Sequence, residues 1–581
     1  MNEKLALADY LLIGGFFAVM LAVGFYFMNR VRSLKDYFSG GNQVPWWLSG
    51  ISLYMSSFSA FSFVAYSALS YKHGWVSVTI WWIVVPSIAL TTYWFAGRWR
   101  RAASTSPLEY IEERYGRGLR QGLAWMGIPM TVMDDGMKLF AIGTLVSVSL
   151  GFSLAWGIFL SGTIMLLYTF LGGLWAVLVT DCIQFVVLVL AVIVLLPLSF
   201  REVGGVGGFI DKAPEGFFDL TSGDYDWVFL VVGVAFVQFL RHGTAWSFIQ
   251  RFYSVRTDAD ARKTGYLVAA LYVVGPPVLF LPAMVSRLFL PEVENTNQVY
   301  ALLCAHLLPA GMMGLVVAAM FSASMSMLSS DYNAVASVFT NDIYKRLLAP
   351  RASERSLVWV GRMATLVIGA VALGMGFLVA ELGEDVDLIK IMVTLFSVCL
   401  PPIAIPMLLG LVSRRVSGAG GLGGFLLGCA AGILAFLVKS IDLQSVEIDL
   451  RYGPTMATIT SLATMAGVIL GTLLRPDSAT KRAQVDRFLD GLTNRPTETR
   501  SGIRSEPARA EAPAEAPAEP EAPAIFPATI IGVSVGSLGV LFALIVLLTV
   551  SRSDWFLSLL VALAMACTGA VFFVVGTRQS R

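Results

Sequence analysis

Three serines in one apolar segment have the spacing of a cation-binding helix face. Ser326, Ser329 and Ser330 are separated by three and four residues, which places their hydroxyl groups on the same side of an α-helix. A dehydrated sodium ion needs several such oxygens and a compensating negative charge. Asp181 supplies that charge if its own helix packs against the serine face. Serine is also a common small residue at helix contacts, so the pattern alone has a structural explanation as well.

Six ionisable residues lie inside apolar segments, where charge is costly and usually serves a function. These residues are Asp134, Asp135, Lys138, Asp181, Arg241 and Asp331. Asp135 and Lys138 are three residues apart, so they can neutralise each other on one helix and leave Asp134 free. A free Asp134 suits an amine or hydroxyl groups, and Arg241 suits a carboxylate. The alternative for Arg241 is an ion pair with an internal carboxylate.

Two apolar segments are interrupted by polar residues. Serines recur through the segment near 45–72, and the segment near 227–249 contains Gln238, Arg241 and His242. Unwound backbone at membrane depth occurs where it lines a cavity, and transporters use such breaks to bind solutes and ions. Polar packing between helices is the alternative. The two segments are five spans apart, as an inverted repeat of five helices requires, which favours transport.

The composition places these segments in a lipid bilayer. Of the 581 residues, 56% are hydrophobic and 14% are charged, and the mean hydropathy is +0.72. Soluble domains have roughly 25% charged residues, so a soluble globular fold is excluded. The net charge is +2 without a polybasic run, so we expect no nucleic-acid partner. The cysteines lack CxxC spacing, the histidines are far apart, and no nucleophile–base pair is evident, so we expect no enzymatic activity.

A transmembrane helix needs about 20 largely apolar residues, which predicts about thirteen spans in residues 1–475. We expect these spans near 7–29, 45–72, 76–99, 120–149, 152–173, 174–199, 227–249, 264–290, 309–340, 358–381, 388–412, 417–438 and 455–474. The first is a retained span, because its apolar run is longer than a signal core. Residues 476–527 are rich in Ala, Glu and Pro, which predicts a disordered cytoplasmic linker. Residues 528–581 form an appended hairpin of two spans, whose partner the sequence does not indicate.

Basic residues mark one side of the membrane, because Lys and Arg gather in cytoplasmic loops. They occupy every second connection, in the groups Arg30/Arg32/Lys35, Arg98/Arg100/Arg101/Arg114/Arg117/Arg120, Arg251/Arg256/Arg262/Lys263, Lys345/Arg346/Arg351/Arg355 and Arg414/Arg415. The intervening connections, 202–226, 292–294 and 381–387, are acidic. This alternation predicts an integral protein of the plasma or inner membrane, with the N-terminus outside and the C-terminus cytoplasmic.

One segment resembles a family signature. Tyr168-Thr169-Phe170-Leu171-Gly172-Gly173-Leu174-Trp175-Ala176-Val177, followed by Thr180-Asp181-Cys182-Ile183-Gln184, is similar to the signature of the sodium/solute symporter family. Ser106-Pro107-Leu108-Glu109-Tyr110 with Arg114-Tyr115-Gly116, and Phe339-Thr340-Asn341-Asp342-Ile343-Tyr344-Lys345, are similar to its intracellular segments. The resemblance covers about residues 5–475. It implies an all-α, LeuT-type bundle of five plus five inverted-repeat helices, with an extra N-terminal helix and alternating access.

The resemblance also implies two sodium sites. The family's common site uses backbone carbonyls at positions that match Met55 and Phe58, with Ala323 and two adjacent hydroxyl groups. The first hydroxyl matches Ser326, but the second falls on Met327, whose thioether is a poor sodium ligand. A second site, found in some members, matches Asp181, Ser326, Ser329 and Ser330 without loss. We therefore expect sodium coupling to persist, with the second site as the candidate for the dominant one.

The solute is less well indicated. The positions that bind sugar in sugar-carrying members of the family fall on Ser62, Trp81, Gln238, Tyr272 and Arg241, and among these Gln238 alone is chemically close. Trp81 offers a stacking face for a sugar or another ring. Arg241 and Asp134 together suit a zwitterion or a polar acid.

These observations lead to one functional hypothesis and its alternatives. We expect a sodium-coupled symporter that imports a small polar organic solute, either a sugar or a carboxylate or zwitterion such as an amino acid or organic acid. A transporter-derived membrane sensor and a proton-coupled symporter are the alternatives. An intramembrane enzyme and a channel are disfavoured, because the sequence has no catalytic set and a channel does not need two broken helices.

Overall fold

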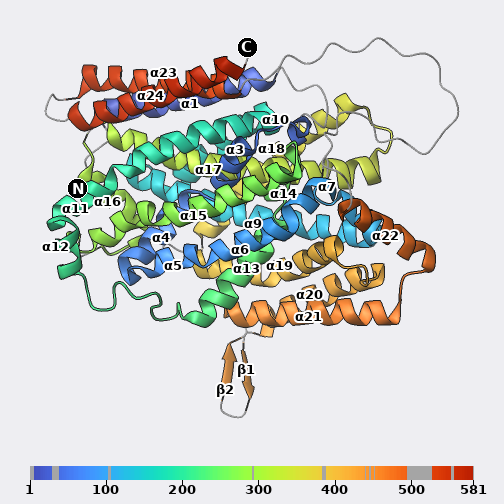
Figure 1. Ribbon diagram of the computed structural model, residues 1–581. Coiled ribbons are helices and arrows are strands. Elements are labelled where there is room, and N and C mark those ends of the chain that lie inside the picture. Colours follow the sequence, from blue (N-terminus) through green and yellow to red (C-terminus); the bar gives the residue numbers. More distant parts are fainter. Residues whose placement is uncertain are drawn as a thin grey trace, which may run out of the picture.

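The computed structural model is a bundle of long helices that run in roughly one direction (Figure 1). It describes residues 6–28, 38–102, 106–290, 293–309, 311–381, 388–438, 440–443, 446–449, 452–493, 527–550 and 555–579. Helix α17 lies at the centre, and every residue of it except Met313 is buried. The helices that carry the candidate ion and solute residues surround α17.

The first half of the bundle begins with α1 (Leu7–Met28) and the pair α3 (Trp46–Met55) and α4 (Ala60–His73). It continues through α5 (Val76–Trp82), α6 (Val84–Thr91), η2 (Thr92–Ala96), α7 (Gly97–Ala102), α8 (Glu109–Arg114), α9 (Arg117–Leu150), α10 (Leu154–Ile193), α11 (Leu195–Val203) and α12 (Gly205–Lys212). A short 3-10 turn, η1 (Gly40–Asn42), precedes α3.

The second half begins with η3 (Phe229–Phe236), α13 (Val237–Thr244) and α14 (Trp246–Ser254). It continues through α15 (Asp258–Ser286), η4 (Thr296–Gln298), α16 (Val299–Leu307), α17 (Met312–Val338), η5 (Phe339–Leu348), α18 (Glu354–Ala380), α19 (Leu388–Val412), α20 (Gly418–Val438) and α21 (Gly453–Leu474). Strands β1 (Ser440–Leu443) and β2 (Val446–Asp449) form an antiparallel hairpin between α20 and α21, which the expectation of a wholly helical chain did not include.

Both predicted breaks are present. The axes of α3 and α4 differ by 57°, and the helix that ends at Thr244 meets α14 at 49°. Ser59 is fully extended, with φ −149° and ψ 176°, so it cannot continue the ladder of helical hydrogen bonds. Ala245 has ψ 127° and interrupts the second helix in the same way. Each break leaves polar backbone at the centre of the bundle.

The number of apolar helices is close to the expected number of spans. Within the described residues, 11 helices are long and apolar enough to cross a membrane, or 13 when each bent pair counts as one span, and these counts include the two helices of the C-terminal hairpin. The sequence predicts about thirteen spans before residue 475 and two in the hairpin. Helix α9 is outside this count because Asp134, Asp135 and Lys138 lie near its middle. The expected division at residue 173 is absent, since α10 is one continuous helix of 40 residues. No proline lies between residues 154 and 193 to break it.

The C-terminal region corrects one expectation. Residues 479–493, which we placed in a disordered linker, form the helix α22 (Ala479–Thr493). Its apolar residues Val485, Leu489 and Leu492 are buried, and the ring of Phe488 stacks on Tyr110 at 6.0 Å. This apolar stripe provides the burial that the Ala/Glu/Pro composition of the region as a whole did not predict. The rest of the linker, residues 494–526, lies outside the described residues.

The appended hairpin consists of α23 (Pro527–Thr549) and α24 (Trp555–Gln579). Helix α23 packs beside α1, and both hairpin helices pack beside α10, so the hairpin lies on the side of the bundle that carries α1 (Figure 1). The hairpin is closely packed because glycines face each other, and a Cβ atom at Gly569 would lie 2.4 Å from the backbone nitrogen of Gly536.

Candidate functional site

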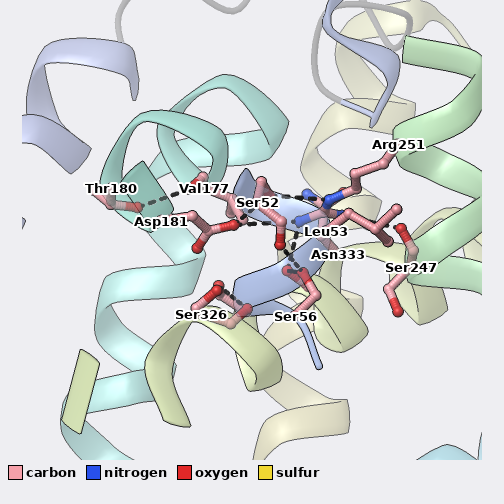
Figure 2. A network of polar contacts seen from close by, with 12 residues as sticks. Ser52, Leu53, Ser56, Val177, Thr180, Asp181, Ser247, Arg251, Ser326 and Asn333 are labelled. Atoms are coloured by element: carbon pink, nitrogen blue, oxygen red, sulfur yellow. Dashed lines mark hydrogen bonds and ion pairs between the residues drawn. The ribbon is translucent and has the colours of Figure 1, made fainter. Parts of the chain in front are cut away.

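Asp181 lies at the centre of a buried polar network between four helices (Figure 2). Ser52 on α3 donates a hydrogen bond to Oδ2 of Asp181, which comes from α10. Nη2 of Arg251, on α14, lies 3.6 Å from the same oxygen, and both side chains are 0% exposed. Arg251 also donates from Nε to Ser52 Oγ at 3.1 Å and from Nη2 to Ser330 Oγ at 2.5 Å. The network therefore joins α3, α10 and α14 to the serine face of α17.

Two oxygens in this network have no hydrogen bond of regular geometry to described residues. They are Oδ1 of Asp181 and Oγ of Ser326, and both atoms are buried. The two groups are neighbours, since the Ser326 hydroxyl lies within hydrogen-bond reach of the Asp181 carboxyl. A buried polar atom without a partner is costly. A small cation bound between these oxygens would remove that cost.

The other two serines of the predicted face already have partners. Ser330 Oγ lies 2.9 Å from Ser56 Oγ on α3. Ser329 donates to the backbone carbonyl of Ser326 at 3.1 Å, which is a bond within its own helix. The lone pairs of both hydroxyl oxygens are still able to accept a cation. The structure thus links Asp181 and Ser330 through Arg251 and Ser52 and places the Ser326 hydroxyl beside Asp181, whereas Ser329 bonds along α17.

The residues expected for the common sodium site lie at the first helix break. Met55 ends α3, and its carbonyl accepts a hydrogen bond from the Phe58 N–H at 3.0 Å. The Ala60 N–H, at the start of α4, donates to Ser324 Oγ on α17 at 2.8 Å. Ala323 adjoins Ser324 in the chain and is 0% exposed. The break therefore contacts α17 at the helical turn where the resemblance places the ion.

The side chain of Met327 lines a cavity in the middle of the bundle, which we call the central cavity. Met327 therefore adds no oxygen ligand at the helix break. The position that holds the second hydroxyl group in the family therefore contributes an apolar surface to the cavity wall.

All six residues expected to contact the solute line this one central cavity. They come from α4, α5, α9, α13 and α15, and they are Ser62, Trp81, Asp134, Gln238, Arg241 and Tyr272. The outermost two, Ser62 and Tyr272, are more than 200 positions apart in the chain, so only the fold brings the six residues together.

The cavity has an aromatic wall with polar atoms available to a ligand. The rings of Trp81 and Tyr272 are 4.8 Å apart, and the rings of Trp81 and Phe58 are 4.7 Å apart. Trp81 Nε1 and Gln238 Oε1 are buried and have no hydrogen-bond partner among the described residues. The wall of the cavity therefore offers a ligand one hydrogen-bond donor, the Trp81 N–H, and one acceptor, the Gln238 oxygen.

Charged residues form the opposite side of the cavity. Nζ of Lys138 lies 2.8 Å from Asp134, 2.7 Å from Asp135 and 2.7 Å from Asp331. Arg241 Nη2 lies 3.5 Å from Asp134. The expectation of a free Asp134 is therefore wrong, because Lys138 reaches all three carboxylates. The alternative in which Arg241 pairs with an internal carboxylate is confirmed.

The charge of this cluster is unbalanced. Three aspartates face two cations, so one negative charge is in excess when all five groups are ionised. Oxygens of Asp134, Asp135 and Asp331 lie within 4.8 Å of one another, as ligands of a metal ion would. The ammonium group of Lys138 already bonds to all three carboxylates, so it occupies the position that a metal ion would take among them.

Arg251 is the main residue that the sequence analysis misplaced. We counted it with the basic residues of a cytoplasmic loop, but it is fully buried on α14 beside Asp181. Its position directly after the interrupted span expected near 227–249 was the available signal. Gln250 shares that position and donates to Asn333 on α17 at 2.7 Å.

The intracellular segments of the resemblance meet at one end of the bundle. Arg120 donates from Nε to Asp342 at 2.6 Å and from Nη1 to Glu112 at 2.7 Å. Ser106 donates to the second oxygen of Asp342 at 2.5 Å. Two stretches that are more than 200 residues apart thus form one buried ion-pair cluster. The side chains of Tyr168 and residues 170–173 of the signature lie outside the described residues.

Comparison with known proteins identifies relatives of the chain. The model of the sodium:solute symporter family matches residues 37–428. The sodium/sialic acid symporter NanT of Aliivibrio fischeri is 28% identical over 388 residues, which are 62% of this chain and 74% of that protein. The sodium/sialic acid symporter SiaT of Proteus mirabilis is 25% identical, over 81% of this chain and 95% of its own length. Sodium/glucose cotransporter 1 of Ovis aries is 25% identical, over 74% of this chain and 72% of its own length.

Solved structures agree in fold. A sodium-coupled sialic acid symporter in a substrate-bound, outward-open state superposes with a TM-score of 0.68 at 22% identity, over 81% of this chain and 99% of its own. Mhp1, a nucleobase-cation-symport-1 family transporter, superposes with a TM-score of 0.52 at 13% identity, over 78% of this chain and 98% of its own. The expected LeuT-type helical bundle is therefore confirmed.

Proposed function

The chain belongs to the sodium:solute symporter family, and we propose on that premise that it imports a small polar organic solute together with sodium by alternating access. The observation that supports this function best is the juxtaposition of two sites. The buried Asp181 carboxylate of α10 lies against the serine face of α17, and a polar, aromatic cavity lies beside the first helix break. Coupling requires an ion site and a solute site that share mobile elements, and the first broken helix contributes to both, through Ser52 of α3 in the ion network and Ser62 of α4 in the cavity wall.

We place the dominant sodium ion between Asp181 Oδ1 and Ser326 Oγ, with Ser329 and Ser330 as the remaining side-chain ligands. Both named oxygens are buried and available. Asp181 provides the negative charge, although Arg251 shares it at 3.6 Å. Sodium binding therefore competes with the guanidinium for one carboxylate. This competition predicts a moderate sodium affinity, because the ion must displace or weaken an existing pair.

A second sodium ion at the common site, between Met55, Phe58, Ala323 and Ser326, is a weaker proposal. Ser326 is common to both sites, and Met327 does not replace the missing hydroxyl group, because its side chain lines the cavity. One ion per solute is the stoichiometry that these ligands support best.

The solute that best fits the cavity carries a carboxylate and hydroxyl or amine groups. Arg241 would bind the carboxylate in two parallel hydrogen bonds, and Trp81 and Gln238 would donate and accept at their free atoms. With all five groups of the Lys138 cluster ionised, its excess negative charge disfavours a plain monoanion and favours a zwitterion, or an acid accompanied by sodium. A neutral sugar stacked on Trp81 is the second candidate, and relatives are named for sialic acid, glucose and mannose.

We propose that the end of the bundle with Arg120, Glu112 and Asp342 faces the cytoplasm. The connections at this end are basic, as the distribution of positive charge requires. This orientation puts the N-terminus outside and the C-terminus in the cytoplasm of a cell whose plasma or inner membrane holds the protein. Arg30, Arg32 and Lys35, which belong to the same pattern, lie outside the described residues.

Uptake into proteoliposomes tests the function. The purified protein is reconstituted and given an inward sodium gradient with radiolabelled sialic acid, glucose, mannose, amino acids and organic acids in turn. We expect saturable accumulation of one class under sodium and none under an equal potassium gradient. Accumulation driven by a proton gradient would support the proton-coupled alternative. Sodium-dependent stabilisation without uptake of any solute would support the sensor.

A further inference from the structure

A second cavity lies next to the central one. Its walls are formed by α9, the break between α13 and α14, α17 and α19. Its polar lining includes Thr131, Ser247 and Asp331, and its apolar lining includes Trp246 and Phe396. It therefore has the mixture of aromatic and polar groups that ligand sites use.

The second cavity is displaced toward the end of the bundle that we assigned to the cytoplasm. Along α9, the central cavity is lined by Asp134 and Lys138, whereas the second cavity extends from Asp134 back to Gly127. The N-terminal end of α9 carries Arg120, which pairs with Asp342. Helix α17 gives the same direction, because the central cavity uses residue 327 and the second uses residues 331–335.

Two ion pairs lie at the boundary between the two cavities, Asp134–Arg241 and Lys138–Asp331, and in the second of these, at 2.7 Å, Lys138 lines the central cavity and Asp331 lines the second one. Among the described residues that line them, Asp134 and Arg241 belong to both. Arg241 Nη2 lies 3.5 Å from Asp134 Oδ2. The guanidinium plane rests on the ring of Phe396, a residue of the second cavity, at 4.7 Å. Arg241 thus offers donors to a ligand on either side.

Asp134 has another cation within reach, so the pair can open without leaving a buried charge unpaired. Lys138 Nζ already lies 2.8 Å from Asp134. A ligand carboxylate that takes over Arg241 would leave Asp134 with Lys138. The cost of separating a buried pair, which is several kcal/mol when a charge is left alone, is thereby avoided.

Resting on the proposed function, we propose that the second cavity is a cytoplasmic-side binding site for the same carboxylate-bearing solute, and that the Asp134–Arg241 pair closes the passage between the two sites. Arg241 holds the solute carboxylate in both positions. Trp246 and Phe396 replace Trp81 and Tyr272 as the apolar surface when the solute moves inward.

Thiol labelling tests this arrangement without any solute. In a background with the five native cysteines replaced by alanine, Ala334→Cys reports on the second cavity and Val234→Cys on the central one. Inside-out vesicles are treated with a membrane-impermeant, positively charged methanethiosulfonate. We expect A334C to be modified about tenfold faster than V234C from this side, because the ion pair closes the passage.

Opening the closure gives the decisive comparison. Asp134→Asn should raise the labelling rate of V234C about tenfold from the cytoplasmic side. Asp135→Asn is the matched control, because Asp135 also bonds to Lys138 but lines neither cavity. If Asp134→Asn does not fold, Arg241→Gln removes the pair from its other side.

The outcomes separate this proposal from the proposed function. Slow labelling of A334C from the cytoplasmic side, or an unchanged rate at V234C in Asp134→Asn, would overturn the second site. The expected labelling pattern in a protein that shows no sodium-driven uptake would support the closure and contradict the transport function.

Discussion

Nη2 of Arg251 lies 3.6 Å from Oδ2 of Asp181, and both side chains are fully buried. Ser52 bonds to both groups and holds them in place. The other carboxylate oxygen, Oδ1, has no hydrogen bond of regular geometry to the described residues, and the Ser326 hydroxyl is the neighbouring group. Asp181 therefore presents one oxygen to an internal cation and one oxygen to the proposed sodium ion. Arg251 and the proposed sodium ion therefore share the negative charge of Asp181, and this sharing determines how substitutions in the network act.

Replacing the carboxylate should weaken sodium binding. Asp181→Asn removes the negative charge and leaves the Arg251 guanidinium unopposed, so we expect at least about a tenfold loss of apparent sodium affinity, equivalent to roughly 1.4 kcal/mol. The measurement is the sodium concentration that gives half-maximal stabilisation. Asp9→Asn is the control, since Asp9 is also buried but accepts its hydrogen bond from the Gly314 N–H, which is not one of the proposed sodium ligands. Unchanged sodium dependence in Asp181→Asn would contradict the assignment.

Removing the internal competitor should have the opposite effect. Arg251→Gln leaves Asp181 as an uncompensated buried carboxylate, which destabilises the protein in the absence of sodium. Sodium then restores the balance, so we expect a lower melting temperature in potassium together with a larger sodium-induced increase. Thermal unfolding in the two salts measures both quantities. A variant whose response to sodium is smaller than that of the wild type would show that Arg251 assists sodium binding rather than opposing it.

Much of the site could be predicted because helical periodicity identifies residues on one face. The spacing of Ser326, Ser329 and Ser330 correctly indicated a polar face of a buried helix, and both helix breaks followed from interrupted apolar runs. Placement by motif also worked for the cavity, since residues as distant as Ser62 and Tyr272 line the same space. Their binding roles stay predictions.

Pairing between helices was not predictable in the same way. Sequence spacing linked Asp135 to Lys138, but it gave no means to see that Asp331, from another helix, reaches the same ammonium group. Arg251 was misassigned because an arginine at the end of an apolar segment has the same pattern whether it is buried or in a loop. Helix α22 was hidden in a region whose overall composition is that of a linker.

The ion-pair cluster of Arg120, Glu112 and Asp342 should make the stability of the protein depend on pH in the acid range. Burial alone would raise the pKa of Glu112, but its hydrogen bond from Arg120 and the charge of Arg346 outweigh burial and lower this pKa. A lowered pKa stabilises the fold above the unfolded-state value of about 4.3, and this contribution is lost as the pH falls through the folded-state pKa. We expect Glu112→Gln to lower the melting temperature at pH 7, and the difference from wild type to shrink toward pH 4.

The neighbouring residue provides the control for this pH effect. Glu113 is exposed and its side chain forms no ion pair among the described residues. Glu113→Gln should leave the pH profile of the melting temperature unchanged. A difference for Glu112→Gln that is the same at pH 4 and pH 7 would show that the ionised carboxylate is not the source of the stabilisation.

Helix α22 should depend on one aromatic contact. Phe488→Ala removes the ring that stacks on Tyr110. We expect the packing of α22 on the bundle to lose about 1–3 kcal/mol of free energy, and proteolysis after residue 475 to become faster. Arg487→Ala is the matched control, because the Arg487 side chain is exposed and bonds to the Ala483 carbonyl of its own helix. Limited proteolysis in detergent compares the two variants. Equal cleavage of Phe488→Ala and wild type would mean that α22 is held by other contacts.

The most direct test of the account is the thermal stability of the detergent-purified protein in sodium against potassium at constant ionic strength. A specifically bound ion stabilises the folded state by mass action, by about 2.7 kcal/mol at one hundred times its dissociation constant. We predict sodium-specific stabilisation of the wild type, its loss in Ser326→Ala, and its retention in Ser322→Ala, whose hydroxyl bonds to the Ala318 carbonyl of its own helix at 2.7 Å. Equal melting temperatures in the two salts, or full sodium stabilisation of Ser326→Ala, would contradict the proposed site.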